Sequence, residues 1–169
     1  MKPMQTRKEK VLKLLEDLDI PYEIHVHPAV ATVEEALPYW QKIEATHCKN
    51  LFFRNHKGNR HYLVILRHDR KLNIRDLEQR LRQGKITFAS PRRMERYLGV
   101  TGGSVSLFGL INDRENHVHL FLDAGLKSAA RISFHPNENT ATVVISYQSF
   151  LKFLEWSGNA YEFINLYEE

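Results

Sequence analysis

The chain alternates between segments in which apolar residues recur every three or four positions and segments in which they alternate or run together. The first pattern, combined with N-cap residues and closing glycines, predicts five helices. Their expected ranges are 6–19, 32–40, 73–83, 90–99 and 146–158. Thr6 and Thr32 each open a capping box. Ser90-Pro91 is a strong helix start, because serine caps well and proline is tolerated at the first helical position.

The second pattern predicts strands at 22–26, 48–54, 61–67, 86–88, 117–122, 131–135 and 140–145. The turn residues His56-Lys57-Gly58-Asn59 join two of these strands into a hairpin. The glycine-rich stretch 100–109 follows a helix and is expected to be a loop that runs into a further strand. The last residues, which include Tyr161, Phe163 and Tyr167, are expected to dock on the core.

Short connections join these elements, and no linker, repeat or low-complexity segment interrupts them. Strands outnumber helices, and some strands are joined as hairpins while others are separated by helices. The pattern predicts one α+β domain over residues 1–169, built on a mixed, barrel-like β-sheet surrounded by helices. The length of 169 residues suits a single domain.

The amino-acid composition indicates in which cellular compartment the protein is expected. Hydrophobic residues make up 43% and charged residues 26% of the chain, as in ordinary globular proteins. No apolar run approaches the roughly 20 residues of a membrane-spanning helix, and the first ten residues lack a signal core. Cys48 is the single cysteine, so an intrachain disulfide is impossible. We therefore expect a cytoplasmic protein without a membrane partner.

Charge is distributed unevenly. The segment from Arg67 to Arg96 carries ten Lys/Arg and four Asp/Glu, whereas the segment from Asn112 to Glu169 carries four Lys/Arg and eight Asp/Glu. The basic middle segment is either a patch that meets a polyanion or a solvated, arginine-rich helix face. Charge alone does not separate these two interpretations.

Several catalytic signatures are absent or weak. The chain has no G-x-x-x-x-G-K-[ST] phosphate loop and no G-x-S-x-G nucleophile elbow. Among the nine histidines, the pairs His25/His27 and His117/His119 each face one side of a strand, but no third ligand group accompanies them, so we expect no metal. Cys48 is either a nucleophile or a small buried hydrophobe, and we favour the second.

Three segments remain as candidates. Lys49 and Asn50 stand at the mouth of an apolar run, so the lysine either snorkels to the surface or is held in a pocket. Gly102-Gly103-Ser104 either presents several amide N–H groups to a phosphate or an oxyanion, or is a plain turn. The segment from His135 to Asn139 is either a hairpin turn or brings its two end side chains to the cavity of Lys49.

These segments resemble the bacterial YbaK/prolyl-tRNA-editing family. The resemblance rests on Thr46-His47-Cys48-Lys49-Asn50-Leu51-Phe52, Arg67-His68-Asp69-Arg70-Lys71, Phe88-Ala89-Ser90-Pro91, Leu98-Gly99-Val100-Thr101-Gly102-Gly103-Ser104-Val105, Phe108-Gly109-Leu110-Ile111-Asn112-Asp113 and Phe134-His135-Pro136-Asn137-Glu138-Asn139-Thr140-Ala141-Thr142. It extends from Lys10 to Gly158. Within this family, the chain is most similar to the freestanding deacylases that remove alanine from tRNA for proline.

The resemblance implies the roles of individual residues. The essential lysine of the family falls on Lys49, its neighbouring asparagine on Asn50, its histidine on His135 and a further pocket asparagine on Asn139. The Gly-x-x-x-Pro loop of the family falls on Gly103-Ser104-Val105-Ser106-Leu107. Leu107 replaces a usual proline, and Gly102 replaces another, so we expect a looser loop and a less certain amino-acid selectivity.

A mechanism without cofactor or metal is expected from this resemblance. Amide groups of the Gly103 loop stabilise the oxyanion, with Gly102 and Ser104 beside them, and Lys49 holds the tRNA 3′ end. His135 and Asn139 position the amino acid or the water, and the substrate 2′-hydroxyl takes part. The residues expected to form the apolar pocket are Val26, Leu51, Val105 and Phe134. Leu107 is expected to bind the substrate as part of the loop. The expected tRNA-binding residues are Arg67, Arg70, Lys71, Arg80, Arg92 and Arg93.

Two other functions stay open. One keeps the fold and replaces the substrate by cysteine, serine or another small amino acid on a different tRNA. The other is a binding module for tRNA or a synthetase that has no catalytic activity. A monomer is expected, with tRNA-Pro as partner and a transient complex with a synthetase or an elongation factor.

Overall fold

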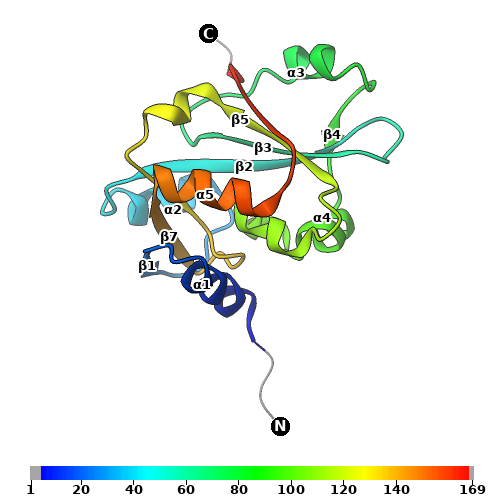
Figure 1. The fold of residues 1–169 in the computed structure, drawn as a ribbon. Helices are drawn as coiled ribbons and strands as arrows, with labels where there is room; N and C mark the ends of the chain where they lie inside the picture. Colours follow the sequence, from blue (N-terminus) through cyan, green and yellow to red (C-terminus); the bar gives the residue numbers. More distant parts are fainter. Residues whose placement is uncertain (1–4, 168–169) are drawn as a thin grey trace.

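Residues 5–167 are described by a computed structural model, in which one mixed β-sheet is flanked by helices (Figure 1). The strand order is β1-β7-β6-β2-β3-β5-β8, with β4 paired to β2. The strands are β1 (Glu23–Val26), β2 (Thr46–Arg54), β3 (His61–Arg67), β4 (Thr87–Phe88), β5 (Val118–Asp123), β6 (Arg131–Phe134), β7 (Ala141–Ser146) and β8 (Tyr161–Ile164). The predicted α+β class with a mixed sheet is confirmed, although β1 and β8 end the sheet instead of closing a barrel.

The five helices begin where their capping residues predict. They are α1 (Arg7–Asp17), α2 (Val33–Trp40), α3 (Ile74–Leu81), α4 (Pro91–Leu98) and α5 (Tyr147–Ser157). Each N-cap side chain accepts a hydrogen bond from an amide of the first turn, and these N-caps are Thr6, Thr32, Asn73, Ser90 and Ser146. Gly99 and Gly158 close α4 and α5 with positive φ, as expected of helix-ending glycines. The C-cap of α3 is Arg82, which has positive φ, and Gly84 two residues later has positive φ as well.

The glycine-rich stretch does not run into a strand, so that prediction was wrong. It forms two 3₁₀ helices, η1 (Gly102–Ser104) and η2 (Leu107–Asn112), and a third, η3 (Ala124–Ser128), follows β5. The Ser106 hydroxyl accepts from the Phe108 amide and starts η2. The alternation of serine with apolar residues at 104–107 imitates the period of a strand. Burial of the whole turn 107–110 against the core favours the helical path instead.

The hairpin of β2 and β3 forms the centre of the molecule. Phe52 belongs to a core shared with α1, α4 and α5, whereas Phe53 belongs to a second core beneath α3 on the opposite face. In Figure 1, α5 crosses one face of the sheet and α3 lies at the far end from α1. The C-terminal residues dock as expected, because β8 pairs in parallel with β5. Within residues 5–167 no helix is long and apolar enough to cross a membrane.

One edge of β2 is left open over a few residues. The His68 amide donates to the His47 carbonyl and the Asn55 amide to the Arg60 carbonyl, so the odd-numbered residues of β2 bond to β3. The main chain of Asn50 therefore faces the other side. There β6 pairs with residues 46–47, β4 pairs with residues 53–54, and the Ala89 amide donates to the Phe52 carbonyl. The intervening edge borders the cavity described next.

Candidate active site

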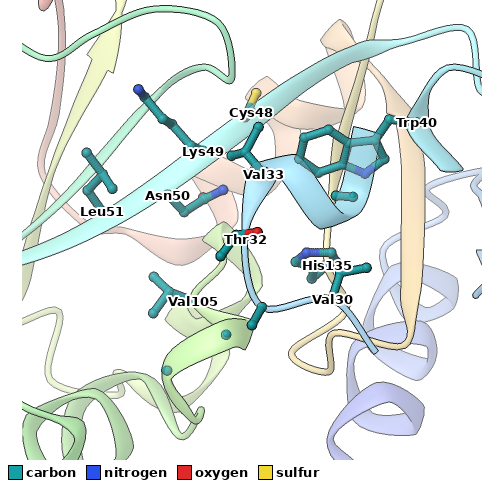
Figure 2. Close-up of a pocket in the computed structure, with 14 residues that line it drawn as sticks. Val30, Thr32, Val33, Trp40, Cys48, Lys49, Asn50, Leu51, Val105 and His135 are labelled. Carbon is teal, nitrogen blue, oxygen red and sulfur yellow. The ribbon is translucent and has the colours of Figure 1, made fainter. Parts of the chain in front are cut away.

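A cavity of about 210 Å³ lies where β2, β6, α2 and η1 meet (Figure 2). Four segments line it: the start of α2 with the residues before it, the middle of β2, the η1 loop and the end of β6. The lining residues are Val30, Ala31, Thr32, Val33, Ala36, Trp40, Cys48, Lys49, Asn50, Leu51, Gly102, Gly103, Val105 and His135. The three segments that the sequence singled out separately therefore converge on one cavity.

Lys49 lies at the rim of this cavity. Its side chain is half-buried, and in Figure 2 the ammonium group points away from His135. Burial lowers the pKa of Lys49, whereas the carboxylates of Asp69 and Glu34 act in the opposite direction. Within residues 5–167 neither carboxylate forms an ion pair with it. The lysine is therefore a partly desolvated charge that is available to an anionic ligand.

His135 presents an uncharged imidazole to the cavity. Its Nδ1 lies 2.8 Å from the Ala141 carbonyl, which can only accept, so Nδ1 carries the proton. Burial lowers the pKa of His135 by more than the hydrogen bond to the Ala141 carbonyl raises it. The neighbouring His27 lowers this pKa further. The Nε2 atom therefore keeps its lone pair at neutral pH and can accept a hydrogen bond from a water or a substrate.

The Asn50 side chain points into the cavity, toward Thr32 in Figure 2. Its Oδ1 atom is buried, and within residues 5–167 it has no hydrogen-bond partner. The main-chain N–H and C=O of Asn50 lie on the open edge of β2. A buried polar atom without a partner costs about 1–3 kcal/mol. This is consistent with a residue arranged for a ligand.

The η1 loop packs closely on the segment before α2. A β-carbon on Gly103 would lie 3.0 Å from Asn139 Nδ2 and 3.4 Å from the Ala31 Cα, whereas one on Gly102 would meet nothing within 4 Å. Asn139 donates to the Val30 carbonyl at 2.8 Å and so ties the two segments together. In the described part of the chain, no acceptor bonds the amide of Gly102 or Gly103.

Trp40 and two histidines form the wall behind this site. Trp40 stacks on His47 with ring centroids 4.9 Å apart and an interplanar angle of 2°. His47 bonds the Ser133 hydroxyl at 2.6 Å and the Ile43 carbonyl at 2.9 Å. Thr142 accepts from the Trp40 indole and bonds His27. Trp40 thus lines the cavity, and the histidines and hydroxyl groups behind it hold its ring in place.

Some predicted pocket residues lie elsewhere. Val26 is 74% exposed on the edge strand β1, so the prediction that it lines the pocket was wrong. Phe134 and Leu107 are buried in the core, and Ser104 is the buried last residue of η1, so none of the three lines the cavity. Alternation along a strand cannot show which face a neighbouring element covers, and Val26 is the last residue of an edge strand.

Asn139 acts one layer behind the cavity, through its bond to Val30. Cys48 lies at the cavity, but burial raises the pKa of its thiol far above the ordinary value. A thiol that stays protonated is a poor nucleophile, which favours the interpretation as a small buried hydrophobe. Within residues 5–167 no three metal-ligating side chains gather in one place.

The basic middle segment does not form one continuous surface. Arg67 lies opposite Cys48 in the β2–β3 register and pairs with Asp69 at 2.8 Å. Arg80 on α3 pairs with Asp76, and Arg70 lies over the Tyr167 ring with Lys71 next in the chain. Arg92 and Arg93 lie on α4 beyond β4, at the other end of β2.

Sequence reasoning missed the segment from Val30 to Val33, together with Ala36 and Trp40. The capping box at Thr32 predicts where α2 begins, but no local signal shows that this helix start faces the cavity. The apolar side chains of Val30, Val33 and Val105 surround the site in Figure 2. They give the cavity an apolar part of its lining.

An α+β domain whose small cavity combines one cation, one uncharged imidazole and free main-chain amides has the layout of a hydrolase for acyl esters. The model of the aminoacyl-tRNA editing domain matches residues 27–153. The chain therefore belongs to the aminoacyl-tRNA editing family, and the expected enzyme class, an aminoacyl-tRNA deacylase, is confirmed.

Individual proteins agree with this assignment. The chain is 37% identical over 163 residues to the prolyl-tRNA editing protein ProX of Acetoanaerobium sticklandii, covering 94% of this chain and 97% of that protein. It is 35% identical over 156 residues to the prolyl-tRNA synthetase associated domain-containing protein 1 of Xenopus laevis, covering 90% and 92%. A solved structure of a candidate trans-editing enzyme for prolyl tRNA synthetase has a TM-score of 0.74 at 19% identity, covering 99% and 100%, and supports the fold.

Proposed function

We propose that this protein is a trans-editing deacylase that hydrolyses the aminoacyl ester of mischarged Ala-tRNA(Pro). The observation that carries the proposal is the single cavity in which Lys49, Asn50, Gly103 and His135 meet. The names of the relatives, a prolyl-tRNA editing protein and a prolyl-tRNA synthetase associated protein, support the choice of tRNA.

The apolar side of the cavity provides the place for a small side chain. Val30, Val33, Leu51 and Val105 surround it, and the cavity of about 210 Å³ equals the volume of about seven liquid water molecules. A synthetase discriminates poorly against a missing methylene, which is worth only ~1–3 kcal/mol. A second site that admits a methyl group and excludes a larger ring corrects that error.

The polar side provides the chemistry. A water held by the His135 Nε2 lone pair attacks the ester carbonyl and gives its proton to Nε2. The proton then passes, with the substrate 2′-hydroxyl as relay, to the ribose 3′-oxygen, which leaves as a hydroxyl when its bond to the carbonyl carbon breaks. Negative charge then develops on the carbonyl oxygen. The amide of Gly103, which has no internal acceptor in the described part of the chain, donates to that oxygen. The open edge of β2 supplies the Asn50 carbonyl to the substrate ammonium group.

Lys49 binds the tRNA end. Its partly desolvated ammonium group at the rim is suited to a phosphate or a 2′-hydroxyl of the terminal nucleotide. Part of the basic segment from Arg67 to Arg93 contacts the acceptor stem, because its members lie at both ends of β2. Such contacts make binding weaken as salt concentration rises.

Release of amino acid from a panel of mischarged tRNAs tests this function. Wild type should deacylate Ala-tRNA(Pro) faster than Pro-tRNA(Pro) and faster than seryl or cysteinyl esters. Lys49→Ala should lower kcat/KM by about 100-fold, which corresponds to ~2.7 kcal/mol. Lys13→Ala, on the exposed face of α1, is the matched control and should change nothing.

Each alternative has its own outcome in this assay. Faster release of serine or cysteine than of alanine would replace the substrate while keeping the fold and the site. Salt-sensitive tRNA binding without release of any amino acid would show a binding module. Equal activity of wild type and Lys49→Ala would remove the lysine from the mechanism.

A further inference from the structure

The side chains of Arg54 and Arg93 meet at the end of β2 that is remote from Lys49, and Arg96 lies one turn further along α4. Arg54 ends β2, and Arg93 and Arg96 lie on neighbouring turns of α4. A β-carbon built on Gly58, in the hairpin turn, would lie 2.9 Å from Arg93 Nη2 and 3.1 Å from Arg54 Nη2. The two guanidinium groups therefore flank one point of the turn. We call Arg54, Arg93 and Arg96 the arginine cluster.

A pair of histidines fixes Arg93 in this cluster. Arg93 Nη1 donates to the Gly58 carbonyl at 2.8 Å and to His61 Nε2 at 2.9 Å. His61 Nδ1 lies 2.9 Å from His117 Nε2, so the proton of His61 is on Nδ1 and its lone pair faces the arginine. Burial, followed by the neighbouring cationic groups, lowers the pKa of His61 to about 4. An uncharged His61 thus orients Arg93 without neutralising it.

Among residues 5–167 no acidic side chain forms an ion pair with the cluster. Arg54 donates to the main-chain carbonyls of Asn55 at 3.2 Å and His56 at 3.0 Å, and Arg96 lies over the Tyr97 ring. Like charges held together by neutral groups repel one another unless an anion joins them. The cluster therefore has the composition of a site for an anionic ligand.

The cluster lies on the same side of β2 as the cavity. Arg54 and Asn50 are four residues apart, so both side chains leave the same face, about 13 Å apart at ~3.3 Å per residue. Helix α4 carries Arg93 and Arg96 and leads through Gly99 into the η1 loop at the cavity. A strand whose 3′ end enters the cavity reaches the cluster within a few nucleotides.

We propose that the arginine cluster binds phosphodiester groups of the tRNA strand a few nucleotides before its aminoacylated 3′ end. The proposal rests on the function proposed above and specifies a second anchor for the same substrate. Exposed Lys57, Arg60 and Arg92 extend the positive surface around it. Arginine suits this role because its planar fork can bind two phosphate oxygens at once.

Binding of uncharged tRNA-Pro, followed by fluorescence anisotropy at several salt concentrations, tests the proposal without any hydrolysis. The double variant Arg54→Gln/Arg96→Gln leaves Arg93 and its histidine partner in place, so the fold should persist. We expect its Kd to rise about tenfold or more and the slope of log K against log salt to fall by about 2. Lys13→Gln/Lys127→Gln removes the same charge elsewhere and should leave both unchanged.

Three further measurements decide the outcome. Arg54→Lys/Arg96→Lys keeps the charge but loses the planar fork, so its Kd should lie between those of wild type and the glutamine variant. The value of kcat at saturating substrate should be unchanged in the glutamine variant, because the cluster does not touch the ester. Equal Kd values for the glutamine variant and the control would overturn the proposal. So would displacement of the tRNA by micromolar inorganic phosphate at constant ionic strength, which would indicate a site for a free anion.

Because tRNA binding is measured apart from deacylation, the two proposals fail separately. An inactive protein that binds tRNA through the cluster would contradict only the proposed function. An active protein whose Kd for tRNA does not change when the cluster is substituted would contradict only this inference.

Discussion

The two walls of the cavity are built in different ways. The sheet wall, from Cys48 to Leu51 with His135 beside it, is held by the ladder to β3 and by the bond of the imidazole to Ala141. The loop wall, from Gly102 to Val105, is held by the turn bond from the Ser104 amide to the Thr101 carbonyl and by its packing against Ala31. The groups that need fixed geometry are on the sheet wall. The loop wall is the part that small sequence changes can reshape.

The two neighbouring glycines of the loop wall provide the strongest test of this difference. Gly103→Ala places a methyl group 3.0 Å from Asn139 Nδ2 and should push the loop away from Ala31, lowering kcat/KM for Ala-tRNA(Pro) by about tenfold or more. Gly102→Ala is the matched control, because its methyl group meets nothing within 4 Å. Similar kinetics for the two variants would show that close packing of the loop does not matter.

On the sheet wall, the pH dependence of kcat/KM tests the lone pair of His135. Protonation of Nε2 removes the acceptor, so activity should fall as the pH decreases through the pKa of His135. Burial lowers that pKa, so the fall should lie below pH ~6.5, the ordinary value for histidine. His135→Gln should lower kcat/KM and lose this acid limb, whereas His25→Gln, on the exposed edge strand, should keep it. An acid limb that survives in His135→Gln would assign it to another group.

The smallest expected effect is a stiffer loop wall. Thr101 is extended, with ψ of 168°, which suits a residue before proline, and the Gly102 amide bonds no acceptor within residues 5–167. Gly102→Pro should therefore stabilise the protein by about 0.5–1 kcal/mol, or roughly 1–4 °C in Tm. Unchanged kcat is expected, because Gly103 supplies the oxyanion donor. A large loss of kcat would instead assign that role to the Gly102 amide.

Local signals in the sequence predict much of this fold. Capping residues such as Thr6 and Ser90 and the turn at Gly58 act over a few positions, and the helices and the hairpin follow them. The meeting of Lys49, Gly103 and His135 became an expectation through the family resemblance. It did not follow from spacing, because the three residues come from β2, η1 and the end of β6.

The remaining features depend on contacts between distant segments. Leu107 enters the core because η2 turns inward, and Val26 stays outside because β1 is the last strand of the sheet. The start of α2 reaches the cavity because Asn139 binds Val30. The arginine cluster combines Arg54 with residues about forty positions later in the chain. The basic segment from Arg67 to Arg96, found by counting charges, contains Arg93 and Arg96 but not Arg54.

The interruption in the pairing of β2 has a consequence for the behaviour of the protein in a crowded solution. A strand edge with free main-chain groups is a template on which another chain can add a strand and begin to aggregate. Here the unpaired stretch of β2 lies between the residues that pair with β6 and those that pair with β4. This stretch is shorter than a usual strand. The protein can thus offer backbone groups to a ligand while remaining closed to self-association along the same edge.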